Sequence, residues 1–173
     1  MRAGTPPSPP EVKKLAADTR RVLGARNLPR PVRCVYVPGV PCWKVSAEKI
    51  EVRLHDSFPG HWRLNMSWML VAIPPTNELT VQESSIGLYA ARVPALGGSD
   101  EEVCLVRYDT DLTEPGVALP PLGAHINVFQ PRGLQDKVHY VLPGYSELDW
   151  QLSEVLDFLL SDRLVRDLTD RLH

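Results

Sequence analysis

The residues best suited to chemistry lie between Val103 and Leu142, in three stretches that alternate polar and apolar side chains. The polar positions have odd numbers and supply a guanidinium, a carboxylate, two imidazoles and an amide: Arg107, Asp109, His125, His139 and Asn127. The even positions are apolar and include Ile126, Val128, Val138, Tyr140 and Leu142. Because successive side chains of a strand point to opposite faces, the sequence predicts that the five polar residues share one wet sheet face.

The pairing register of the last two strands decides whether these residues meet. If Val128 lies opposite Val138, then Asn127 lies opposite His139, and His125 lies beside them. A slip by one residue would scatter the set between the two faces of the sheet. We therefore expect the site only in the first of these registers.

Such a set suits three kinds of site. Two histidines can divide general acid and base work near neutral pH. Arg107 would then neutralise a scissile phosphate and Asp109 would orient a histidine, as in a metal-independent ribonuclease. Alternatively, His125 and His139 with Asp109 or Asp111 can hold a divalent metal. The face can also bind an anionic partner, and polar-out alternation places the same residues on any solvated antiparallel sheet without a function.

Motifs with a specific spacing are absent from the sequence. It has no phosphate-binding loop, no Gly-x-Ser-x-Gly, no His-Glu-x-x-His and no dinucleotide fingerprint. Its three cysteines, Cys34, Cys42 and Cys104, form no Cys-x-x-Cys pair. We therefore expect no cofactor, and the metal-free site is the leading hypothesis.

Helical periodicity marks both ends of the chain. Ser8 to Glu11 has the spacing of a capping box, and apolar residues then recur at helical intervals from Val12 to Leu23. Ser146 is the expected N-cap of a second amphipathic helix. The apolar face of that helix holds Leu152, Val155, Leu156 and Leu159. A helix is therefore expected on each side of the β region.

Strands are predicted by β-branched runs and by strict alternation, at Val32–Val37, Trp43–Asp56, His61–Ile73, Ile86–Val93, Val103–Asp109, Ala124–Gln130 and Lys137–Leu142. Their connections are short and rich in Pro and Gly, which leaves no room for the helical crossover of a parallel pair. The predicted fold class is α+β, with a single curved, mostly antiparallel sheet of six or seven strands and N-terminal and C-terminal helices. His61–Ile73 is the expected central strand, and we expect its alternate residues from Trp62 to Leu70 to pack against the C-terminal helix.

Length and charge set broad limits. The 173 residues suit a single domain, expected over residues 8–173 after a loose Pro-rich tail at residues 1–7. Residues 1–33 hold eight Lys or Arg and two acidic residues, a net +6, so the remainder carries −8. The formal net charge of −2 argues against a generally cationic nucleic-acid binder. The negative balance outside residues 1–33 counts against an RNA-cleaving face, which needs positive potential. Without a secretory signal or an apolar run of the ~20 residues that a membrane span needs, we expect a cytoplasmic protein away from the membrane.

Three short motifs resemble the small TumE-like proteins of bacterial toxin–antitoxin pairs: Arg107-Tyr108-Asp109, His125-x-Asn127 and the closing Phe158-Leu159-Leu160 helix. The resemblance covers about the last 70 residues and departs from the family at Asn127, where a second histidine is usual. It implies a small bacterial protein with a toxin-like role directed at RNA. In a non-enzymatic alternative, the protein is an interaction module that binds a partner encoded nearby, through its basic N-terminal or acidic C-terminal helix. The sequence leaves open whether the protein is an enzyme.

Overall fold

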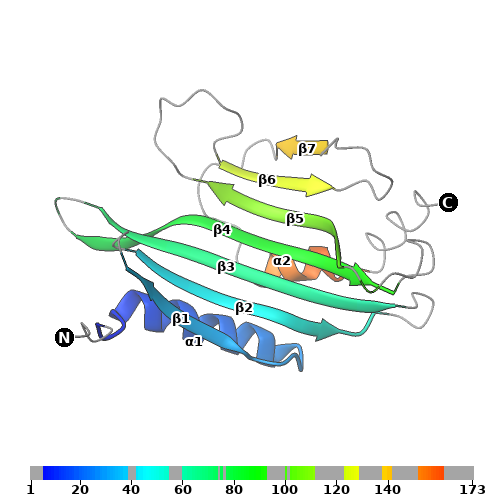
Figure 1. Cartoon of the computed structure of the whole chain (residues 1–173), viewed down its shortest axis with the longest axis horizontal. Helices are drawn as coiled ribbons and strands as arrows, with labels where there is room; N and C mark the ends of the chain where they lie inside the picture. Colours follow the sequence, from blue (N-terminus) through cyan, green and yellow to red (C-terminus); the bar gives the residue numbers. More distant parts are fainter. Residues whose placement is uncertain are drawn as a thin grey trace.

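The computed structural model describes residues 6–38, 42–54, 60–73, 75, 77–92, 100, 102–111, 123–128, 138–141 and 152–161. For residues 73, 110–111, 123–128 and 138–141 it describes the backbone alone. The elements, in chain order, are α1 (Pro10–Ala25), β1 (Val32–Val37), β2 (Cys42–Val52), β3 (His61–Ile73), β4 (Glu78–Ala91), β5 (Val103–Asp111), β6 (Gly123–Val128), β7 (Val138–Val141) and α2 (Leu152–Leu159) (Figure 1). The expected tail at residues 1–7 and the expected N-cap Ser146 fall largely outside the described residues.

The sheet follows the order of the chain. Its hydrogen-bonded neighbours run from β1 to β7 without a crossover, and each neighbouring pair is antiparallel. Short connections between consecutive strands allow only this arrangement. The prediction of an α+β fold, with an antiparallel sheet and a helix from each end region of the chain, is confirmed.

Strand β4 is longer than its sequence predicts. Whereas β1 and β3 have the expected bounds, β4 begins at Glu78 instead of Ile86 and pairs along the whole of β3, from Glu78 opposite Ile73 to Ala91 opposite His61. The added part is rich in polar residues and lacks the apolar run of a strand. Pairing with the long neighbour β3 satisfies its backbone groups, so tertiary context overrides a weak local preference.

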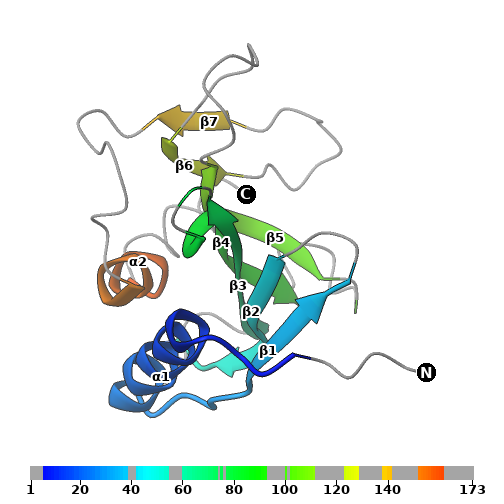
Figure 2. The ribbon, with the colours of Figure 1, turned by 90° about the vertical axis from the view of Figure 1, so that its left-hand side faces the viewer.

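Both described helices lie on the same face of the sheet (Figure 2). α1 contacts β1 and β2, whereas α2 contacts β4 and α1. The β3 side chains that were expected to pack against α2 share one continuous core cluster with it. The elements in contact with α2, however, are β4 and α1, and α1 covers the β1–β2 side. Neither described helix combines the length and the apolar character needed to cross a bilayer.

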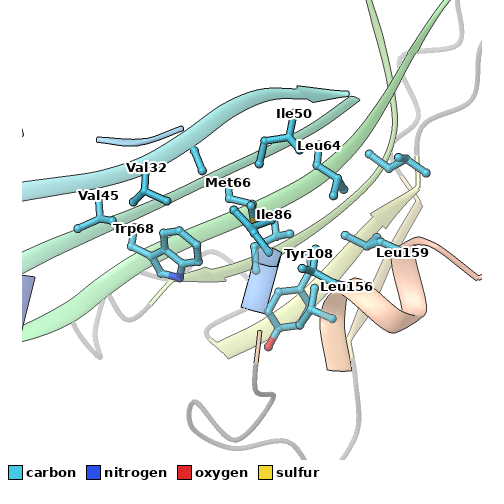
Figure 3. Packing of buried hydrophobic residues seen from close by; sticks show 14 of the residues in the cluster. Val32, Val45, Ile50, Leu64, Met66, Trp68, Ile86, Tyr108, Leu156 and Leu159 are labelled. Atoms are coloured by element: carbon cyan, nitrogen blue, oxygen red, sulfur yellow. The ribbon is translucent and has the colours of Figure 1, made fainter. Parts of the chain in front are cut away.

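The core lies between the helices and the sheet. Trp62, Leu64, Met66, Trp68 and Leu70 of β3 are buried, as predicted, in the same cluster as Val155, Leu156 and Leu159 of α2. Figure 3 shows Leu156 and Leu159 pointing from α2 toward the sheet, where Ile86 and Tyr108 lie. The alternation of β3 therefore identified the buried face of the sheet correctly.

The start of α1 differs from the expected capping box. The N-cap is Pro9, and it makes no side-chain cap hydrogen bond. Pro9 has an extended backbone (φ −60°, ψ 161°) because a residue before proline is disfavoured in the helical region, and the next residue is Pro10. The first helical bond therefore runs from the Lys13 amide to the Pro9 carbonyl, at 3.1 Å. The capping role predicted for Ser8 is wrong.

An arginine joins the two helices. The Arg26 guanidinium, just after α1, donates to the Ser153 carbonyl at 2.9 Å and to Asp157 Oδ1 at 2.5 Å. Its aliphatic stem lies close to α1, since the same guanidinium reaches the Val22 carbonyl at 3.3 Å. These contacts fix α2 against α1 and so hold the helical layer together on the core side of the sheet.

Candidate functional site

The sheet has a second face, opposite the two helices, which we call the outer face. On β3, β4 and β5 its residues alternate with the buried core residues. Among them are Asn65, Ser67, Ser85, Gly87, Arg107 and Asp109. The outer face is therefore polar around Arg107 and Asp109, as the sequence predicts for this part of β5.

Arg107 and Asp109 form an ion pair on the outer face of β5. Arg107 Nε donates to Asp109 Oδ2 at 2.7 Å, and the side chains are only 31% and 13% exposed. Burial lowers the pKa of the Arg107 guanidinium, but the hydrogen bond and the negative charge of Asp109 more than offset it, so the pKa stands above its ordinary value. Asp109 thus fixes the plane of a permanently charged guanidinium.

Tyr89 joins this pair from the neighbouring strand β4. It lies opposite Cys104 in the β4–β5 ladder. A methyl group at Gly87 would lie 2.8 Å from the Tyr89 ring carbon Cε2 and 3.3 Å from Arg107 Cγ. Gly87 therefore leaves the space that the Tyr89 ring and the Arg107 stem occupy, which is a common reason for a glycine inside a strand.

The surroundings of Tyr89 also change its acidity. Burial raises the pKa of the Tyr89 hydroxyl to about 12, with Cys104 adding to the increase and Arg107 opposing it. The hydroxyl therefore stays protonated at neutral pH and remains a hydrogen-bond donor on the outer face.

We expect the raised pKa of Tyr89 to appear as a loss of stability at alkaline pH. The unfolded chain releases this proton near pH 10, whereas the folded chain holds it up to about pH 12. Since the folded state binds more protons in that window, the free energy of unfolding decreases as pH rises from about 10 to about 12. Urea unfolding across this window should show a shallower decrease for Tyr89→Phe. Equal slopes for the two proteins would contradict the assignment.

The register places all five candidate positions in two adjacent rows across the sheet. In the first, the Arg107 row, successive partners from β3 to β7 are Asn65, Gly87, Arg107, Asn127 and His139. In the second, the Asp109 row, successive partners from β2 to β6 are Ser46, Ser67, Ser85, Asp109 and His125. The expected pairing of Val128 with Val138, and hence of Asn127 with His139, is confirmed.

The structure describes the side chains of two of the five candidate residues, Arg107 and Asp109. For Arg107 and Asp109 the structure shows a direct contact. For positions 125, 127 and 139 it describes the backbone register alone. Directly opposed residues of an antiparallel pair place their side chains on the same face, so the gathering of all five on the outer face stays a prediction.

Sequence reasoning missed Tyr89, Gly87 and Ser85. All three have the parity of the outer face, but the predicted strand began at Ile86 and left out the pairing of Ser85 with Asp109. Leu79 and Val81, N-terminal to Ile86, are partly buried and continue the alternation of the strand. They have odd numbers, whereas the buried residues Ile86 and Leu88 have even numbers, because the register shifts between Met69 and Leu70 of β3.

The metal alternative depends on side chains outside the described set, those of His125, His139 and Asp111. Among the side chains that the structure describes, no group of three or more His, Cys, Asp or Glu could hold a metal ion. Asp109 itself is committed to Arg107 through one of its oxygens.

Comparison of the chain with protein-family models, with curated protein sequences and with solved structures found no match in any of the three.

Proposed function

We propose that the protein is a small bacterial, cytoplasmic, toxin-like protein that cleaves RNA on its outer sheet face without a metal ion. The observation that carries the proposal is the register. It aligns Arg107 with Asn127 and His139, and it aligns Asp109 with His125 in the next row. The 2.7 Å bond from Arg107 to Asp109 supports it, because a fixed guanidinium suits recognition of a phosphate.

The proposed reaction is an internal transfer at a phosphodiester bond. One histidine removes the proton from a ribose 2′-hydroxyl, whose oxygen attacks the adjacent phosphorus. The bond from phosphorus to the 5′-oxygen breaks, and the other histidine gives that oxygen a proton. Arg107 neutralises the charge that develops on the phosphate oxygens, and Asn127 donates a hydrogen bond to them. The products are a cyclic 2′,3′-phosphate and a 5′-hydroxyl end.

Asp109 has two tasks in this proposal. The first is to fix Arg107 through the bond from Nε. The second, expected from the sequence, is to orient a histidine, and the pairing of Asp109 with His125 supports it. A carboxylate has acceptor sites on both oxygens, so the two tasks are compatible.

The proposal includes a finer description of the fold, with a single domain over residues 8–173 and a curved sheet of six or seven strands. Three register shifts support the curvature. They lie between Ala47 and Ile50, between Met69 and Leu70, and between Leu88 and Tyr89. Such irregularities bend a strand and increase its twist, which would help the outer face to wrap around a polymer.

The alternative function is that of an interaction module. It is favoured by the exposure of Lys13, Lys14, Arg20 and Arg21 on α1, a basic stripe suited to an acidic partner. Part of that stripe has contacts within the chain: Arg20 donates to the Val32 carbonyl at 3.1 Å and Arg21 to Asp18 at 2.8 Å. The acidic helix α2 likewise uses Asp157 to hold Arg26. The internal contacts of both helices make the outer face the better candidate.

The deciding experiment measures degradation of a single-stranded RNA in the presence of EDTA. We expect wild type to produce cyclic phosphate ends and a variant carrying both His125→Ala and His139→Ala to produce none. Degradation that EDTA abolishes would replace the metal-free site by the metal site. If wild type leaves RNA intact but binds the product of a neighbouring gene, unaffected by His125→Ala, the interaction module is the correct function.

A further inference from the structure

A groove of about 190 Å³ lies on the outer face over β2, β3 and β4. Its lining includes two lysines, an amide, two hydroxyls and an aromatic ring, from Lys44, Lys49, Asn65, Ser67, Ser85 and Tyr89. Glu48 also lines it and lies 3.8 Å from Lys44. Since both members of that pair are about half exposed, the contact is weak, and the two lysines leave the groove with a net positive charge.

Lys49 is held in an unusual backbone conformation at the edge of the groove. It lies in the irregular stretch between Ala47 and Ile50, with φ of 56°. Its amide donates to Asn65 Oδ1 at 2.6 Å, which fixes the turn of the chain. Glycine adopts this conformation at no steric cost. Residues held in such conformations cluster at functional sites, which supports a role for the Lys49 side chain.

The groove is continuous with the proposed reaction site. Asn65 belongs to the Arg107 row, and Ser67 and Ser85 belong to the Asp109 row. Tyr89 lines the groove and lies close enough to Arg107 for each to shift the pKa of the other. With strands about 4.8 Å apart, the path from β2 to β5 is about 14 Å long. It is bordered by small side chains and by Gly87, so a flexible polymer can lie across it.

We propose that this groove is a binding subsite for single-stranded RNA, next to the nucleotide whose bond is cleaved. Phosphates lie near Lys44 and Lys49, and a base stacks on the Tyr89 ring. A cationic groove with an aromatic platform is the arrangement by which proteins bind single strands without reading their sequence. This inference rests on the proposed function for its choice of ligand. It concerns different residues, so it can be tested separately.

The test is binding of a 2′-O-methyl oligoribonucleotide, measured by fluorescence anisotropy with the whole chain. This probe lacks the 2′-hydroxyl nucleophile and stays intact during the measurement. Each phosphate contact contributes about 0.7 to the slope of log affinity against log salt. Lys44→Ala and Lys49→Ala should each lower that slope by about 0.7 and weaken binding about fivefold at 0.1 M salt.

The matched controls are Lys13→Ala and Lys14→Ala, which remove the same charge from exposed positions of α1 in the helical layer. They should leave the affinity and the salt slope unchanged. Losses as large as those of the groove variants would show that binding follows the overall charge, and would overturn the proposal. Unchanged affinity in Lys44→Ala and Lys49→Ala would overturn it as well.

Tyr89 provides an independent measurement that is insensitive to charge. Tyr89→Phe keeps the ring and should keep the affinity, whereas Tyr89→Leu should weaken binding at least about fivefold through the loss of base stacking. Equal affinity for Tyr89→Leu and wild type would reject the stacking contact. Groove-dependent binding without RNA cleavage would uphold the subsite and reject the ribonuclease. Cleavage without groove-dependent binding would do the reverse.

Discussion

Leu156→Ala is expected to lower the free energy of unfolding by about 2–5 kcal/mol. Leu156 is fully buried on α2, within a core cluster that includes Ile86 and Tyr108 of the sheet. The truncation removes apolar contacts and leaves a cavity that rigid strands on one side and α1 on the other cannot close completely. Urea unfolding monitored by tryptophan fluorescence would measure the change.

A matched control for this truncation is Val35→Ala. Val35 lies on the edge strand β1 and is 53% exposed, so its removal should change the free energy of unfolding by less than about 0.5 kcal/mol. A similarly small change for Leu156→Ala would mean that α2 does not cover the sheet in solution. A large loss for Leu156→Ala alone would establish that α2 is an essential part of the core.

The layout of the fold could be predicted because single elements had strong patterns. In β3, Trp62, Leu64, Met66 and Trp68 alternate with polar residues, which fixes both the strand type and its buried face. The short connections then required antiparallel pairing. In α1, the buried residues Val12, Ala16, Thr19 and Leu23 follow helical spacing closely. The sequence therefore predicted the helix correctly, although it did not predict how the helix is capped.

The rest of the site could not be predicted, because register shifts break the parity on which face assignment depends. Between Leu88 and Tyr89 the partner in β5 jumps from Val106 to Cys104, and Leu105 at this irregularity is buried. A strict alternation would have placed Leu105 on the wet face with Arg107. The groove beside Lys49 depends on another such irregularity in β2, whose presence no local pattern indicates.

The Arg107–Asp109 contact, in contrast, follows from spacing alone. Residues two apart on a strand project from the same face, and an arginine is long enough to reach a carboxylate at that separation. What spacing could not give is the burial of the pair, whose side chains are only 31% and 13% exposed. Burial strengthens the attraction between Arg107 and Asp109, because a charge–charge interaction becomes stronger as water is excluded.

Arg107→Ala is expected to lower kcat/KM for RNA cleavage by about 10²–10³-fold, the usual loss when one group that stabilises transition-state charge is removed. Arg107→Lys keeps the charge but loses the planar fork and the bond from Nε to Asp109, so we expect an intermediate loss. Both variants should also lose stability, by roughly 1–3 kcal/mol for the alanine, a value between those of exposed and buried ion pairs.

Arg63→Ala separates these two effects. Arg63 is 30% exposed, close to the 31% of Arg107, and it also binds a carboxylate, that of Glu102. It lies on β3 opposite Tyr89 and outside the Arg107 and Asp109 rows, so its removal should cost comparable stability and lower kcat/KM far less than Arg107→Ala does. If Arg63→Ala and Arg107→Ala reduced cleavage equally, the loss would reflect general positive potential or a weakened sheet. If Arg107→Ala alone abolished cleavage while the two proteins unfolded at similar urea concentrations, Arg107 would be acting on the phosphate itself.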